Sequence, residues 1–178
     1  MKVISGIYRG RNIEGYDLEG TRPTQDRIKE NIFNIIGNDI RDKIVLDLFS
    51  GSGSLGIEAA SRGAKHVFFN DYNKDSINII NKNINNIGIN NCTVIYNDYK
   101  NTLKNIDKKM DVILLDPPYD SNYIGICIKL INKYDVLNKD GIIVCETDDL
   151  DKIKYNEEYV CIKNKRYGDK YIVILKKI

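Results

Sequence analysis

Segments of strand length and helix length alternate along most of this chain, and this alternation limits the folds that it can adopt. Residues 43–49 (KIVLDLF) are almost continuously apolar, which is typical of a strand buried on both faces. Similar patterns predict strands at 66–70, 92–96, 111–115 and 141–146, and helices near 74–87, 99–106 and 122–134. The alternation predicts an α/β fold with a parallel sheet, right-handed crossovers and helices on both faces.

The two ends of the chain depart from this alternation. Strand-like runs near 158–164 and 170–176 are separated only by RYGD, which predicts an antiparallel hairpin. Upstream of the first strand, Thr24 can cap a helix whose isoleucines recur at helical spacing and which ends at Gly37. The chain therefore begins with a helix that can lay one apolar face on the core.

Length and composition exclude several classes of protein. The 178 residues suffice for one α/β domain, expected at 41–178, and an N-terminal extension at 1–40. No run approaches the roughly 18 apolar residues of a membrane span, and no signal peptide is recognisable, so we expect a cytoplasmic protein. We also expect a monomer. Four cysteines lie far apart and His66 is the one histidine, which favours free thiols over a metal site or disulfides.

A glycine-rich loop, GSGSLG (51–56), joins the first buried strand to a helix. Its G-x-G-x-x-G spacing suits either a pyrophosphate or an aminoacyl nucleoside, because glycine lets the backbone turn sharply beside a ligand. Asp47, four residues before Gly51, favours the second ligand. A carboxylate would repel a pyrophosphate but can hold the methionine ammonium of S-adenosylmethionine. The alternative, a nicotinamide-dependent oxidoreductase, leaves Asp47 unexplained.

Two more acidic residues follow later strands. Asp71 ends the second strand, where it can accept hydrogen bonds from both ribose hydroxyls. Asp98 follows the third strand and can accept the adenine amino group, with Tyr99 alongside the ring. Each acid can instead cap a turn or helix, but acids after three successive strands favour a ligand at that edge. The predicted cofactor-binding residues are Asp47, Phe49, Gly51, Ser52, Gly53, Asp71, Asp98 and Tyr99.

The tetrapeptide Asp116-Pro117-Pro118-Tyr119 directly follows the predicted strand at 111–115. The exocyclic amine of a nucleobase is a poor nucleophile because its lone pair is delocalised into the ring. The Asp116 carboxylate and the Pro117 carbonyl can accept its two hydrogens, and the prolines hold these acceptors still. Tyr119 offers a flat face on which the base can stack. A rigid turn whose aspartate caps the next helix is the alternative; we predict that these four residues are catalytic.

At these residues the chain resembles the class I S-adenosylmethionine-dependent amino-methyltransferases, which share a [DNS]-PP-[YFW] motif. More closely, it resembles the RsmD-type family, which methylates guanine N2 in bacterial 16S ribosomal RNA. The matching segments are ISGIYRGR (4–11), TRPTQDRIKENIFNII (21–36), DLFSGSGSLGIEAASRGA (47–64), FNDYN (69–73), LDPPY (115–119) and KRYGD (165–169). Asn70 and Lys170 depart from the family pattern, which more often has a hydrophobic residue and Thr there.

The resemblance implies a Rossmann-like, seven-stranded sheet with an antiparallel last strand, preceded by a small N-terminal β-hairpin. It implies S-adenosylmethionine as the cofactor and 16S ribosomal RNA, or a partly assembled small subunit, as the partner. It also implies catalysis at Asp116 and base contact at Tyr119. A DNA adenine or cytosine amino-methyltransferase is the alternative function, although such enzymes usually carry a separate target-recognition region.

Basic residues concentrate at both ends of the chain. Residues 163–178 contain six Lys or Arg against one Asp, and residues 1–11 contain three basic residues and no acid. Such patches are typical of contacts with RNA phosphates, although a solvated surface is the alternative. The predicted RNA-binding residues are Arg9, Arg11, Arg22, Thr24, Lys165 and Arg166.

Overall fold

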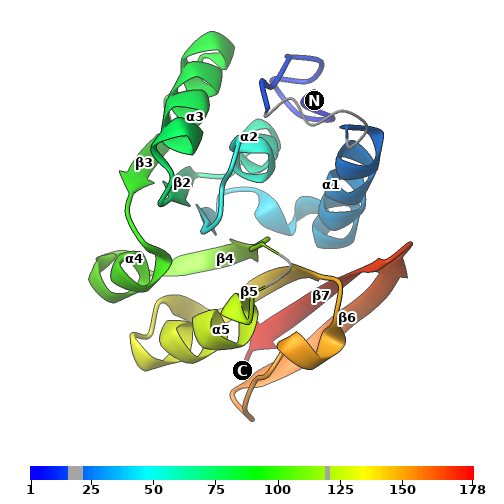
Figure 1. Ribbon diagram of the computed structural model, residues 1–178, viewed down its shortest axis with the longest axis vertical. Coiled ribbons are helices and arrows are strands. Elements are labelled where there is room, and N and C mark those ends of the chain that lie inside the picture. The colour runs from blue at the N-terminus through cyan, green and yellow to red at the C-terminus, as the bar shows by residue number, and fades with distance from the viewer. Residues whose placement is uncertain (16–21, 119–120) are drawn as a thin grey trace.

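The computed structural model confirms the alternation of strands and helices (Figure 1). The structure describes residues 1–15, 22–118 and 121–178, apart from the side chains of residues 22–25 and 38. The strands are β1 (Ile44–Asp47), β2 (His66–Asp71), β3 (Cys92–Tyr96), β4 (Met110–Leu115), β5 (Leu137–Thr147), β6 (Tyr159–Tyr167) and β7 (Lys170–Lys177). The helices are α1 (Arg22–Ile36), α2 (Ser54–Ser61), α3 (Lys74–Ile87), α4 (Tyr99–Asn105) and α5 (Tyr123–Lys133), with 3-10 turns η1 (Gly37–Ile40) and η2 (Leu150–Lys152). None of these described helices is long and apolar enough to cross a membrane.

The described strands form one sheet in the order β3-β2-β1-β4-β5-β7-β6. β1 pairs in parallel with β2 on one side and with β4 on the other, so the strand order reverses between β1 and β4. β7 is antiparallel to both β5 and β6. The fold class predicted from the resemblance is therefore confirmed. Ligands of open α/β sheets bind beyond the carboxyl ends of the strands at such a reversal.

Each face of the sheet has its own apolar core, because alternate residues of a strand point to opposite faces. On one face, Phe33 of α1, Ile57 of α2 and Ile80 of α3 belong to one buried cluster with strand residues. On the other face, Leu103 of α4 and Ile128 of α5 belong to a second. Figure 1 shows α1, α2 and α3 on the side of the sheet opposite to α4 and α5. The arrangement has three layers, with the sheet in the middle.

The structure corrects the ends of several predicted elements. Strand β1 ends at Asp47 rather than at residue 49, and β5 begins at Leu137 rather than at residue 141. Helix α1 begins at Arg22, so Thr24 lies inside the helix and is not its cap. Pro23 suits this earlier start, because the first turn of a helix needs no backbone N–H donor from it. Strand β6 continues to Tyr167, so the C-terminal hairpin turns at residues 168–169 rather than over the whole of RYGD.

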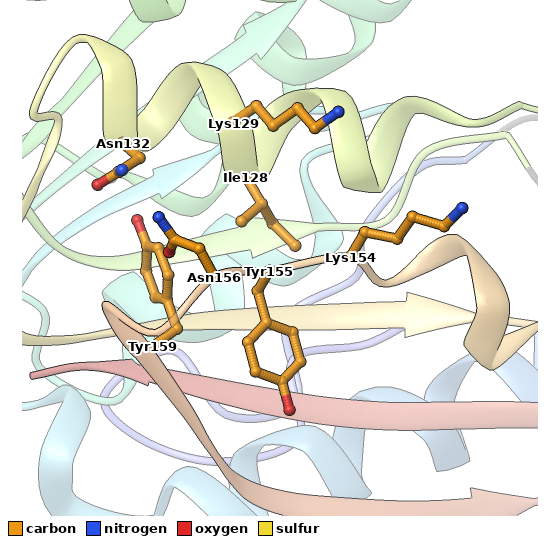
Figure 2. A pocket seen from close by; sticks show the side chains of 7 residues that line it. All are labelled: Ile128, Lys129, Asn132, Lys154, Tyr155, Asn156 and Tyr159. Atoms are coloured by element: carbon orange, nitrogen blue, oxygen red, sulfur yellow. The ribbon is translucent and has the colours of Figure 1, made fainter.

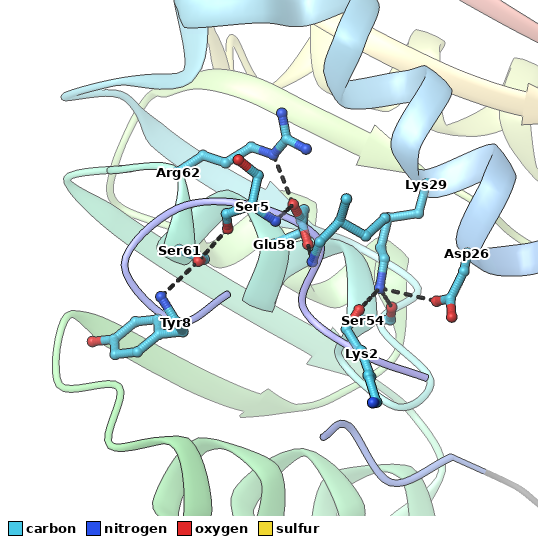
Figure 3. Close-up of polar contacts among 10 residues, drawn as sticks. Lys2, Ser5, Tyr8, Asp26, Lys29, Ser54, Glu58, Ser61 and Arg62 are labelled. Atoms are coloured by element: carbon cyan, nitrogen blue, oxygen red, sulfur yellow. Dashed lines mark hydrogen bonds and ion pairs between the residues drawn. The ribbon is translucent and has the colours of Figure 1, made fainter. Parts of the chain in front are cut away.

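The N-terminal segment forms a short antiparallel hairpin with a bridge between Lys2 and Asn12, and its backbone hydrogen bonds include Val3 N–H to the Arg11 carbonyl and Ile13 N–H to the Met1 carbonyl. The hairpin is attached to α2 through the fully buried carboxylate of Glu58 (Figure 3). This carboxylate accepts hydrogen bonds from the backbone N–H groups of Ile4 (2.8 Å) and Ser5 (3.0 Å). A side chain of α2 therefore satisfies the two backbone donors that follow the first arm of the hairpin.

Two further contacts complete this attachment (Figure 3). The guanidinium of Arg62 lies on Glu58, with 2.7 Å between Nε and Oε1. The hydroxyl of Ser61 accepts the backbone N–H of Tyr8 at 3.0 Å and donates to the Ser5 carbonyl. Residues 4–8 are thus held against the C-terminal half of α2.

Helix α1 is joined to the same region through Lys29, which is 2% exposed. Its ammonium donates to the Lys2 carbonyl (2.7 Å) and to the Ser54 hydroxyl (3.0 Å), and lies 3.3 Å from Asp26 (Figure 3). Burial lowers the pKa of Lys29, although the nearby carboxylates of Asp26 and Glu58 each raise it in part. Because Ser54 begins α2, Lys29 connects α1 and the N-terminal segment to the end of the glycine loop.

Replacing Glu58 with Ala should lower the free energy of unfolding by about 3 kcal/mol or more, because two backbone N–H groups and one guanidinium lose a buried partner. Urea unfolding would measure the loss, and hydrogen exchange should show faster exchange at the amides of Ile4 and Ser5. Glu30→Ala on the exposed surface of α1 is the matched control and should change stability by less than about 0.5 kcal/mol. Unchanged amide protection in Glu58→Ala would contradict this account of the attachment.

Candidate functional site

The glycine loop lies at the carboxyl end of β1, where the strand order reverses. Gly51 (φ 54°) and Gly53 (φ 81°) adopt left-handed conformations that side-chain-bearing residues rarely tolerate. The Gly53 N–H donates to the Ser50 carbonyl at 2.7 Å, and the Gly51 N–H donates to the Asp71 carboxylate at 2.9 Å. The predicted cofactor loop is thus joined directly to the acid that ends β2.

Asp47 lies beneath this loop and is 1% exposed. One carboxylate oxygen, Oδ2, accepts the N–H of Gly56 at 2.9 Å, which ties the end of β1 to α2. Among the described residues, the other oxygen is buried without a hydrogen-bond partner. Burial raises the pKa of Asp47 to about 7, with a further increase from Asp71. Asp47 therefore favours any positively charged or hydrogen-bond-donating group that reaches the loop.

Asp71 is held still by backbone donors. In addition to the Gly51 amide on Oδ2, Oδ1 accepts the N–H of Asn73 at 2.9 Å. A carboxylate has roughly four acceptor positions, so two backbone bonds leave capacity for a ligand. The neighbouring residue, Asn70, is buried and polar, whereas the resembled family more often has a hydrophobic residue there. Its side-chain amide donates to the Leu48 carbonyl (3.0 Å) and accepts from the Thr102 hydroxyl (2.6 Å). Asn70 thereby joins β2 to α4 and to the residue that follows β1.

Asp98, the third acid predicted to bind the cofactor, caps a helix in the structure, which was the alternative role considered for it. Asp98 is exposed and caps α4, since its carboxylate accepts the Lys100 N–H at 2.9 Å. Tyr99 is buried beside Phe49, and their ring centroids are 5.4 Å apart. Tyr123, which sequence reasoning missed, stacks with Phe49 at 6.0 Å and lies 4.9 Å from Tyr99. An aromatic cluster at the start of α4 and α5 therefore borders the loop.

Asp116 follows β4 at the same edge and is half-buried. Burial and the nearby carboxylate of Glu146 raise its pKa well above the ordinary value, while the ammonium of Lys170 opposes that rise. Pro117 is buried and Pro118 is exposed, and the Pro118 carbonyl accepts the N–H of Ser121 at 3.1 Å. Tyr119, the predicted stacking residue, lies outside the described residues.

Sequence reasoning also missed the ion pair beside Asp116. The Lys170 ammonium at the start of β7 donates to the Glu146 carboxylate of β5 at 2.6 Å, and the Glu146 side chain is only 6% exposed. The one signal was Lys170 itself, which stands where the resembled family more often has Thr. Its partner is 24 positions away in sequence, and only strand pairing brings the two together.

The predicted RNA-binding residues fall in two places. Lys165 and Arg166 are exposed on β6 and pair with residues 171–172 of β7, close to the edge that carries Asp116. Arg9 and Arg11 are exposed on the N-terminal segment, whose Tyr8 contacts the last residue of α2 and so lies at the end of that helix away from the glycine loop. The side chains of Arg22 and Thr24 lie outside the described residues.

A separate pocket of about 360 Å³ lies between α5 and the segment that leads into β6 (Figure 2). The hydroxyl of Tyr159 points toward α5 in Figure 2, while Tyr155 extends away from that helix. Tyr159 pairs with Lys177 at the far end of β7, so the pocket lies toward the sheet edge opposite to Asp116. Among the described residues, no group of three or more His, Cys, Asp or Glu is arranged to hold a metal ion.

Comparisons with known proteins show which family this chain belongs to. The family model described as Conserved hypothetical protein 95 matches residues 1–176. A Bacillus subtilis protein, provisionally named rRNA methyltransferase YlbH, is 36% identical over 182 residues, covering 99% of each chain. Ribosomal RNA small subunit methyltransferase D of Haemophilus influenzae is 34% identical over 172 residues, covering 94% of this chain and 89% of that one. A solved Escherichia coli structure, provisionally named a methyltransferase, has a TM-score of 0.89 at 25% identity, covering 99% of this chain and 97% of that one.

The raised pKa of Asp47 predicts a specific pH dependence of stability. Its carboxyl keeps its proton in the folded state up to about pH 7, whereas the unfolded chain releases it near 3.8. Protonated Asp47 thus makes its full contribution to the free energy of unfolding below about pH 4. That contribution, up to about 4 kcal/mol, is lost as the pH rises to about 7. Asp47→Asn lacks this titration, so urea unfolding from pH 4 to 8 should show the wild type losing stability relative to the variant. Parallel curves would show that Asp47 is already ionised in the folded protein.

Proposed function

Since the chain belongs to the Conserved hypothetical protein 95 family, with relatives named ribosomal RNA small subunit methyltransferase D, we propose that it methylates the exocyclic N2 of a guanine in 16S ribosomal RNA. The methyl donor in this proposal is S-adenosylmethionine. The observation that carries it is the position of Asp116. This acid follows buried β4 at the same sheet edge as the glycine loop after β1.

The residues at the end of β1 and β2 fit the proposed donor. S-adenosylmethionine carries an ammonium, two ribose hydroxyls and an adenine ring, and it supplies an electrophilic methyl group bonded to a sulfonium. The unpartnered, buried Oδ1 of Asp47 suits a positively charged donor group, and the fixed carboxylate of Asp71 suits the ribose hydroxyls. Phe49, Tyr99 and Tyr123 provide aromatic surface for the adenine.

Asp116 has two tasks in the proposed reaction. Its carboxylate accepts a hydrogen bond from the target amine, and the Pro117 carbonyl accepts the second, so that the nitrogen lone pair is directed toward the methyl group. After transfer the nitrogen carries a positive charge and must lose one proton. Burial and Glu146 raise the pKa of Asp116, which makes it a better acceptor for that proton. Tyr119 completes the proposed site as the surface on which the base stacks.

The N-terminal extension and β6 supply the proposed contacts with RNA. A guanine must be unpaired or flipped out before its N2 can reach a pocket, so a loop nucleotide is the proposed target. Lys165 and Arg166 lie near the Asp116 edge and suit phosphates close to that nucleotide. Arg9 and Arg11 lie farther away and suit phosphates of the flanking RNA. In this proposal, residues 1–40 act as an RNA-contacting extension of the methyltransferase domain at 41–178.

Mass mapping of methylated guanines tests the proposed function. Small-subunit RNA and partly assembled subunits, prepared without this activity, should gain one N2-methylguanine on incubation with the protein and S-adenosylmethionine. Asp116→Ala should reduce the single-turnover rate by on the order of 10²-fold or more, because a pre-organised acceptor is lost. Its affinity for S-adenosylhomocysteine should stay within a few-fold of wild type. A near-normal rate in Asp116→Ala would remove this residue from the mechanism.

Replacing Arg9 and Arg11 with Ala should weaken RNA binding and flatten its dependence on salt, by roughly one to two units in the slope of log affinity against log salt. Affinity for S-adenosylhomocysteine should not change. The control replaces two exposed lysines, Lys104 of α4 and Lys108 of the connection from α4 to β4, and should leave the slope unaltered. A wild-type slope together with full methylation activity in the arginine variant would exclude the N-terminal segment from the RNA-binding surface.

A further inference from the structure

Glu146 lies beside Asp116 because of the register between β4 and β5. Leu115, the last residue of β4, pairs with Cys145 of β5 in a parallel ladder, so Asp116 directly after β4 and Glu146 in β5 follow at the same level. Neighbouring positions in a parallel sheet point to the same face. That the Glu146 carboxylate raises the pKa of Asp116 agrees with this proximity. Two carboxylates are therefore adjacent at the edge where the target base is proposed to bind.

The Glu146 carboxylate is held in place before any substrate arrives. Its side chain is 6% exposed, and its Oε1 is 2.6 Å from the ammonium of Lys170. A buried carboxylate that has a cationic partner remains a hydrogen-bond acceptor, because its two oxygens offer roughly four acceptor positions. Pairing with Lys170 thus holds the orientation of Glu146, and a carboxylate in such an ion pair can still accept a hydrogen bond from a ligand.

The edges of the nucleobases differ in what they present next to the exocyclic amine. Guanine has the N1–H donor beside its N2 amine. Adenine has the N1 acceptor beside its N6 amine, and cytosine has the N3 acceptor beside its N4 amine. A carboxylate next to the one that binds the amine therefore complements guanine, but it faces a lone pair in the other two bases. A buried acceptor left facing a lone pair is strongly unfavourable, which gives large discrimination between bases.

We propose that Glu146 determines the specificity of this site for guanine by accepting the N1–H of the base whose N2 amine is bound by Asp116. This inference rests on the proposed function, since it concerns the base at the same site. Lys170 acts as the positioning residue that orients Glu146. A purely structural ion pair between β5 and β7 is the competing explanation, and it predicts no effect on the choice of base.

The test compares guanine with 2,6-diaminopurine at the mapped target position of a ligated small-subunit RNA. Diaminopurine keeps the 2-amino group but has an acceptor at N1 in place of the N1–H. Wild-type protein should methylate guanine with a kcat/KM about 10²-fold or more above that for diaminopurine. Glu146→Gln should lower kcat/KM for guanine. It should also reduce the ratio of kcat/KM for guanine to kcat/KM for diaminopurine at least tenfold, because a glutamine amide can donate to the diaminopurine N1.

Two controls separate a role in recognition from a role in folding. Glu157→Gln makes the same chemical change at an exposed position and should keep the wild-type ratio. Lys170→Gln removes the ion pair while keeping Glu146, so it should lower the rate with both bases and still prefer guanine. Binding of S-adenosylhomocysteine reports whether Glu146→Gln is folded.

Each outcome decides the inference. Equal use of both bases by wild-type protein overturns it without any variant, even if Glu146→Gln does not fold. An active Glu146→Gln with an unchanged base ratio also overturns it and leaves the proposed function intact. If wild-type protein forms no N2-methylguanine on any small-subunit RNA or particle, the proposed function itself fails, and the inference fails with it.

Discussion

The parallel register of β1, β2, β4 and β5 is the constraint on which the candidate site depends. Strands that run in the same direction all end at the same edge of the sheet, so the loops that follow them lie at that edge. The glycine loop after β1, Asp71 at the end of β2, Asp116 after β4 and Glu146 in β5 meet for this reason, although they are far apart in sequence. A change of register by one residue would turn these side chains to the opposite face.

The electrostatic character of this edge follows from burial. Asp47 and Glu146 are almost completely buried and Asp116 is half-buried, so their negative charges are poorly solvated. Burial raises the pKa of both Asp47 and Asp116, and the ammonium of Lys170 compensates part of the charge. An environment of this kind attracts ligand groups that are positively charged or donate hydrogen bonds and disfavours a pyrophosphate. Sulfonium, ammonium, ribose hydroxyls and an exocyclic amine all meet that requirement.

Elements with strong local signals were predicted well from sequence. The bounds predicted for α3 and β3 are confirmed, and α3 has both local signals of a helix end, a cap at Asn73 and a left-handed Gly88. Predictions were poorer where tertiary contacts decide the conformation. Residues 1–15 form a short hairpin with one bridge, and the position of this hairpin depends on Glu58, whose carboxylate accepts the N–H groups of Ile4 and Ser5. The carboxylate of Asp98 caps α4, so its predicted contact with adenine stays a prediction.

The sequence by itself determined the order of strands and helices and the acids that end β1 and β2 and follow β4, and its resemblance to a known family implied the seven-stranded sheet. These inferences rest on apolar periodicity, on glycine and proline backbone preferences and on motifs contiguous in the chain. Only the tertiary structure decided that Glu146 pairs with Lys170 beside Asp116, that Glu58 holds the N-terminal segment and that Asn70 joins β2 to α4. Each of these contacts joins residues that are distant in sequence, and strand register and helix packing determine which of them meet.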